Sequence, residues 1–261
     1  MDSEILEDKK DISADRNDIS PEKPLGARLG EGFFCVVYLI YTTVLVFIMK
    51  GRYDAGVQAA GDLYVSPEYM DTYRYGFGFM LAALLVGGDA FHLIPRIIVN
   101  FRGSMAKQDF FLGLGNLISS ITMTVFYNIL IGMGDTLEYD ESMYNLGIEQ
   151  SILVLTIIRL VILLLPWNGW YKKEPNRPWA IARNIPFALI GILTIVGFMA
   201  IIAHAHNYPF GFYMTIIITV FLSFAFYLPV AIFGKEKPKL GMLMIPKTIC
   251  YMVLLSLLCF Y

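Results

Sequence analysis

Seven apolar segments, each close to the roughly 20 residues that a helix needs to cross the hydrocarbon core of a bilayer, constrain the fold of this chain most strongly. Polar turns separate the segments, and a β-barrel would instead show shorter stretches of alternating hydrophobicity. The sequence therefore predicts an all-α, multi-pass membrane protein, a bundle of seven transmembrane helices. The expected helices cover approximately residues 33–49, 75–98, 109–133, 147–166, 181–204, 210–233 and 242–260.

The composition agrees with a bilayer environment and separates a short N-terminal region from the rest. Hydrophobic residues make up 57% of the chain and charged residues 16%, whereas soluble domains carry about 25% charged residues. Residues 1–30 are polar and acidic, and they have too few apolar side chains to form a core. We therefore expect a disordered acidic cytoplasmic tail at 1–30 and a seven-helix transmembrane domain at 31–261.

The distribution of basic residues between the connections predicts the orientation. Lys and Arg gather in the connections on the N-terminal side, at 102–108, 167–183 and 234–241, whereas the connection 134–146 on the opposite side is purely acidic. Cytoplasmic loops carry the excess of Lys and Arg, so we expect the N-terminus in the cytoplasm and the C-terminus outside, in the cell membrane. Orientation accounts for these basic residues, and no nucleic-acid partner is predicted. The long connection 50–74 is expected to pack over the outer mouth as a cap.

Three ionisable side chains interrupt the second predicted helix. Asp89, His92 and Arg96 are three and four residues apart, a spacing that places them on one helix face. Ionisable groups at membrane depth usually face a bundle interior, a partner or a water-filled cavity. Pro95 lies beside them and removes the hydrogen bond to the carbonyl of Phe91, which predicts a bend next to this polar stripe.

Other polar residues at a similar depth suggest a pocket around the stripe. We expect a polar, basic pocket in the cytoplasmic half, which binds an anionic lipid headgroup or small-molecule ligand in a transport, receptor-like or accessory role. In this pocket, the second and third predicted helices would turn their polar faces to the bundle centre. In the alternative, there is no pocket, and the basic side chains at the helix ends reach to the lipid headgroups. The expected ligand-binding residues are Arg96, Asn116, Ser120, Arg159, Arg183 and Lys247.

Arg159 discriminates between these readings. It lies several residues inside its predicted helix, where reaching the headgroups is strained and a buried partner is favoured. The acidic residue at a matching depth is Asp89, so we expect an Asp89–Arg159 ion pair.

An enzymatic role is the alternative function. Asp89 and His92 would act as an acid–base pair in an intramembrane lipid hydrolase. The other two histidines, His204 and His206, lie at the opposite membrane surface, and an H-x-H pair diverges by about 200° on a helix. No metal site is therefore predicted, and the sequence leaves cofactors and the oligomeric state open.

Two short stretches are similar to segments of known membrane hydrolases. GGDAFH (Gly87–His92) resembles the G-S-x-A-F-H segment of alkaline ceramidases, whose histidine binds zinc, but Gly88 occupies the serine position and the family's H-x-x-x-H pair is absent. Gly88–Asp89 together with FFLGLGNLISSITMTVFY (Phe110–Tyr127) is similar to segments of lysoplasmalogenase-type proteins, whose second S-D motif has no counterpart here. Both resemblances imply a seven-helix bundle and hydrolysis of a lipid.

Overall fold

The computed structural model describes residues 25–60, 69–103, 107–137, 146–170, 177–205, 207–234 and 237–261. The described part is almost entirely helical and contains no strand, and seven of its helices are long and apolar enough to cross a membrane. The all-α, seven-helix fold predicted from the sequence is confirmed, and it identifies an integral membrane protein. The seven helices are α2 (Leu25–Ala60), α3 (Met70–Arg102), α4 (Gln108–Leu137), α5 (Leu146–Leu164), α6 (Arg177–His204), α7 (Phe210–Phe233) and α8 (Met244–Phe260).

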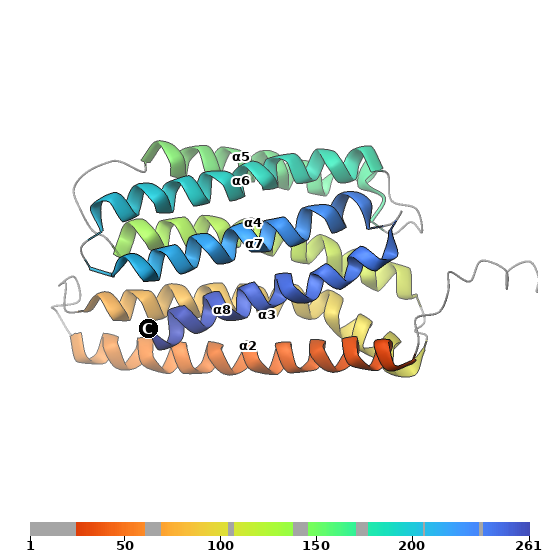
Figure 1. Cartoon of the computed structure of the whole chain (residues 1–261), viewed down its shortest axis with the longest axis horizontal. Coiled ribbons are helices and arrows are strands. Elements are labelled where there is room, and N and C mark those ends of the chain that lie inside the picture. Colours follow the sequence, from red (N-terminus) through yellow and green to blue (C-terminus); the bar gives the residue numbers. More distant parts are fainter. Residues whose placement is uncertain are drawn as a thin grey trace, which may run out of the picture.

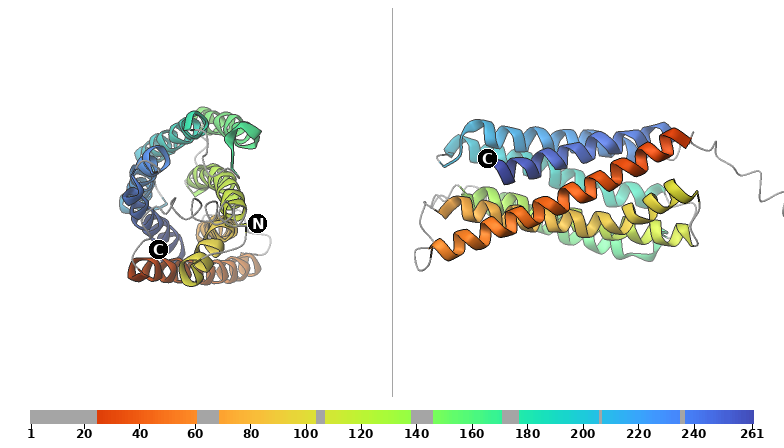
Figure 2. Two further views of the ribbon diagram at one scale, coloured as in Figure 1. Left: turned by 90° about the vertical axis from the view of Figure 1, so that its right-hand side faces the viewer. Right: turned by 90° about the horizontal axis from the view of Figure 1, so that it is seen from below.

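The helices form a ring in which each contacts the next along the chain (Figures 1 and 2). The last helix, α8, closes the ring against α2 and α3, while α4 also contacts α6. Two short 3₁₀ helices, η3 (Pro166–Asn168) and η4 (Pro238–Leu243), precede α6 and α8. Helices from the two ends of the sequence therefore lie side by side.

The first helix is longer than the sequence pattern predicted. α2 begins at Leu25, so residues 25–30 belong to a helix and not to the expected tail, whose residues 1–24 lie outside the described residues. α2 continues to Ala60 and α3 begins at Met70. The expected loop over 50–74 is therefore wrong for most of its length, and residues 61–68 lie outside the described residues.

The extension of α2 past its apolar segment has a local cause. Lys50 donates to Asp54, four residues later, with 2.6 Å between Nζ and Oδ2, and such pairs support a helix.

At about 1.5 Å per residue, the 36 residues of α2 span about 54 Å, more than the hydrocarbon thickness of about 30 Å. In the right view of Figure 2, α2 runs obliquely across the other helices.

Helices α3 and α4 approach closely at two glycines. A Cβ added at Gly115 would lie only 2.6 Å from the carbonyl oxygen of Phe91 and 2.6 Å from the Cα of His92, and one added at Gly88 would overlap Thr122. The Phe91 carbonyl is the one that Pro95 leaves without an intrahelical donor, and α3 remains one helix through this proline. Gly115 thus lets α4 pack against the proline-containing part of α3 and fixes the backbone of His92.

Candidate ligand pocket

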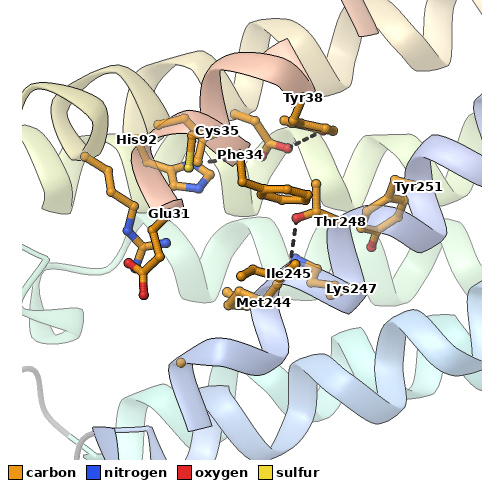
Figure 3. Close-up of a pocket in the computed structure, with 14 residues that line it drawn as sticks. Glu31, Phe34, Cys35, Tyr38, His92, Met244, Ile245, Lys247, Thr248 and Tyr251 are labelled. Atoms are coloured by element: carbon orange, nitrogen blue, oxygen red, sulfur yellow. Dashed lines mark hydrogen bonds and ion pairs between the residues drawn. The ribbon is translucent and has the colours of Figure 1, made fainter. Parts of the chain in front are cut away.

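A cavity of about 60 Å³ lies between α2, α3 and α8, on the side of the bundle where α2 begins (Figure 3). Its polar wall includes Asp89, His92 and Arg96 from α3 and Lys247 from α8, while Phe34, Leu93 and Ile245 are among its apolar lining. A buried water needs about 10–15 Å³ of such volume, so the cavity has room for a small polar group. The spacing of Asp89, His92 and Arg96 in the sequence thus does place all three on one cavity.

Asp89 is held by hydroxyl groups from both neighbouring helices. Tyr38 of α2 donates to its Oδ2 at 2.8 Å, as Figure 3 shows, and Ser119 of α4 donates to its Oδ1 at 2.9 Å. The Nδ1 atom of His92 lies 3.8 Å from Oδ1 of Asp89, beyond hydrogen-bond distance. Within the described residues this buried Nδ1 has no hydrogen-bond partner, so Asp89 is near enough to His92 for electrostatic attraction but does not accept from its ring.

The two cations of the cavity are not neutralised by direct contact with a carboxylate. Arg96 makes no hydrogen bond or ion pair in the described part of the chain. The Nζ atom of Lys247 lies 4.7 Å from the ring centroid of Tyr227 and 5.5 Å from that of Tyr251, close enough for cation–π attraction. Lys247 thus points between aromatic rings and does not reach out to the headgroups as the alternative interpretation expected.

The predicted contribution of α4 is wrong by one residue, because a different face of that helix is turned toward Asp89. Asn116 is exposed, and Ser120 donates to the backbone carbonyl of Asn116 in its own helix. Ser119 supplies the contact to Asp89 instead. Successive helical residues are about 100° apart, and the apolar pattern of this segment was too uniform to determine which of the two serines faces inward.

The predicted pair between Asp89 and Arg159 does not form. Arg159 is buried on α5, where its guanidinium carbon lies 3.5 Å from the ring centroid of Phe187 on α6. Arg183 stands over Trp170 at 4.2 Å and donates to Asn168 at 3.4 Å. Both arginines lie outside the cavity because α5 and α6 are separated from α2 and α3 by other helices of the ring.

The cavity is consequently of mixed charge and not predominantly basic. Two of the four predicted cations, Arg96 and Lys247, line it together with the acidic residues Asp89 and Glu31. Glu31, Cys35 and Tyr38 of α2 were not predicted as site residues. Their spacing of four and three residues indicates a common helix face. The predicted helix began only at residue 33, so Glu31 lay outside it and the shared face was not recognised.

Metal ligands do not gather in the described structure. Among these residues, no group of three or more His, Cys, Asp or Glu side chains is close enough together to hold a metal ion. The side chain of His204 and the whole of His206 lie outside the described residues.

Comparisons with protein-family models, with curated proteins and with solved structures found no match to this chain. The resemblance to membrane hydrolases therefore stands on the short segments quoted from the sequence. Function has to be inferred from the cavity itself.

Proposed function

We propose that the protein binds the anionic headgroup of a membrane amphiphile in the cavity between α2, α3 and α8. The observation that carries this proposal is the pair of cations, Arg96 and Lys247, which line one cavity without a carboxylate in contact among the described residues. Charge-assisted hydrogen bonds from Arg or Lys to phosphate or carboxylate groups are strong. An anionic group between these side chains would accept hydrogen bonds from both cations. The described chain provides no carboxylate that does so.

The other walls of the cavity favour an amphiphile over a fully polar solute. Phe34, Leu93 and Ile245 give apolar surface beside the cations, and the cavity lies where α8 closes the ring against α2. Several residues in the same part of α2, among them Phe33 and Val37, are exposed and apolar, as expected for a lipid-facing surface. A headgroup in the cavity could therefore keep its acyl chains along the outside of α2.

Asp89 has a distinct part in this proposal. It already accepts two hydrogen bonds, so its charge is stabilised locally and it does not occupy the donors of Arg96. It also provides negative charge near Lys247 and His92 when no ligand is bound. The function that follows is ligand binding by a receptor-like, carrier or accessory membrane protein.

The proposal is tested by the thermal stability of purified protein in detergent with added phosphatidylglycerol. At a lipid concentration a hundredfold above Kd, binding is worth about 2.7 kcal/mol, which corresponds to a rise in Tm of about 5–10 °C. Arg96→Gln and Lys247→Met should each reduce this rise to a small fraction. The matched control is Arg102→Gln, because Arg102 is exposed at the end of the same helix and this variant should retain the full response.

Further additions separate the possible sources of the anionic group. Glycerol phosphate and inorganic phosphate should give little stabilisation, because neither fills the apolar part of the site, and phosphatidylcholine should act more weakly than phosphatidylglycerol. An equal response to inorganic phosphate would assign the site to a free anion. A full lipid response in both Arg96→Gln and Lys247→Met would exclude the cavity as the binding site.

A second candidate function, intramembrane lipid hydrolysis, is favoured by one observation. Asp89 and His92 line the same cavity, with Nδ1 of His92 3.8 Å from Oδ1 of Asp89. A small rotation would let Asp89 orient His92 as a general base for water. Incubation of purified protein with defined lipids, followed by mass spectrometry, should then detect a fatty acid or long-chain base, and His92→Gln should abolish that product. If wild-type protein hydrolyses none of the lipids, the hydrolase function is excluded and ligand binding remains.

A further inference from the structure

Among the described residues, two arginines are almost completely buried, and they differ in the hydrogen bonds that stabilise their charge. Arg74 donates to Asp71 at 3.0 Å and to the carbonyl of Leu258 at 2.6 Å. Arg159 is equally buried, with 1% of its surface exposed, yet its Nε and Nη1 atoms have no hydrogen-bond partner in the described structure. A buried charge without hydrogen bonds or an opposite charge is strongly unfavourable.

The hydroxyl groups near Arg159 make hydrogen bonds to one another and, among the described residues, none to its Nε or Nη1 atoms. The groups that interact electrostatically with its charge are Tyr127, Tyr227, Tyr251 and two further cations, Arg183 and Lys247. Tyr127, Tyr251 and Ser223 form a closed triangle of hydroxyl contacts at 3.1–3.2 Å. Tyr227 donates to Asn184 at 2.9 Å.

The end of α5 is also unavailable as an acceptor. The last carbonyls of a helix often accept from a nearby basic side chain. Here Asn168 donates to the carbonyls of Ile162 and Leu165, and Trp170 donates to that of Leu163 at 3.0 Å. Arg159 therefore lies one and a half turns inside a helix end that other side chains already cap.

We infer that Arg159 is the centre of a second site, which binds a small monovalent anion such as chloride. The stacked Phe187 covers one face of the guanidinium. The Nη1 atom at its outer end has no acceptor among the described residues, so an anion can accept from it there. A single enclosed guanidinium suits a compact, singly charged ion rather than a phosphate or a lipid headgroup. Arg159 does not line the cavity between α2, α3 and α8, so this site is separate from the proposed headgroup site, although Tyr251 and Lys247 of that cavity are its electrostatic neighbours.

The test measures Tm of purified protein in chloride and in gluconate at equal ionic strength, because gluconate is too large for an enclosed site. Wild-type protein should gain roughly 2–4 °C in chloride, with saturation, and bromide should replace chloride. Arg159→Met should lose this dependence and, in gluconate, should be at least as stable as wild type, because it removes an uncompensated buried charge. If Arg159 served only to pack on Phe187, the variant would lose stability equally in both salts.

Two controls make the outcome specific. Arg96→Gln should keep the chloride response while losing the lipid response, so failure of either site can be recognised separately. If Arg159→Met does not fold, Arg159→Lys replaces the planar donors by a point charge and should shift half-maximal stabilisation to a higher chloride concentration. Equal Tm values of wild-type protein in chloride and gluconate, or an unchanged chloride response in the Arg159 variant that folds, would overturn the inference.

Discussion

Asp89 shows how this bundle accommodates a carboxylate at membrane depth without a salt bridge to arginine. Its two oxygens accept from Tyr38 and Ser119, on the helices before and after α3 in the chain. Hydrogen bonds to charged groups contribute about 1.5–3 kcal/mol each. Neutral hydroxyls therefore provide much of the stabilisation, and the nearby cations remain available to a ligand.

At the residue scale, double-mutant cycles should distinguish these contacts from the pair that the sequence suggested. Tyr38→Phe and Asp89→Asn should couple by about 1 kcal/mol or more in the free energy of unfolding, because they share one hydrogen bond. Asp89→Asn and Arg159→Gln should be additive within about 0.5 kcal/mol. The measurement is denaturant unfolding of the single and double variants in one detergent. Strong coupling between Asp89 and Arg159 would show that the two side chains meet.

At the scale of single elements, the packing of α3 against α4 depends on glycine at specific positions. Gly115 lies against the main chain of α3, whereas a Cβ at Gly87 would meet no atom within 4 Å. The same chemical change, addition of one methyl group, therefore has opposite consequences at the two positions.

Gly115→Ala should destabilise the protein by about 1–3 kcal/mol, since the added carbon is forced against backbone atoms that cannot rotate away. Gly87→Ala, the matched control, should be neutral or should stabilise α3 by up to about 1 kcal/mol through its better helix propensity. Thermal unfolding of both variants in detergent measures the difference. Equal Tm values for the two variants would mean that α3 and α4 are not in close contact at Gly115.

The elements could be predicted from the sequence more completely than the site. Apolar length determines where a membrane helix lies, so the existence and approximate bounds of the helices were predictable, except where Lys50–Asp54 and the helical residues 25–30 extend α2 into polar sequence. The rotation of each helix and its partners across the ring depend on packing between distant segments. For this reason Ser119 was missed in favour of Ser120, and Arg159 was paired with an acid that it does not contact.

At the scale of the whole molecule, the ring brings the first and last of the seven helices together, and the cavity lies at this junction. Lys237, before α8, and Ala59, near the end of α2, are exposed at opposite ends of the bundle. They provide two positions from which the orientation in the membrane can be measured.

In a background without Cys35, Cys250 and Cys259, we expect Ala59→Cys to react with a membrane-impermeant thiol reagent in intact cells. Lys237→Cys should react only after permeabilisation, because basic connections remain in the cytoplasm. Labelling of both positions by a permeant reagent controls for accessibility within the fold. The reverse pattern would place the cavity on the outer side of the membrane.

Closure of the ring by α8 also sets the order in which the site can arise during synthesis. Tyr38 and Ser119 reach the membrane with the helices on either side of α3, so Asp89 acquires both donors early. Lys247 follows 158 residues after Asp89, a delay of about 8–30 seconds at roughly 5–20 residues per second. A chain that stops after α7 would therefore have six helices and a stabilised carboxylate, but Arg96 would face lipid where α8 should stand.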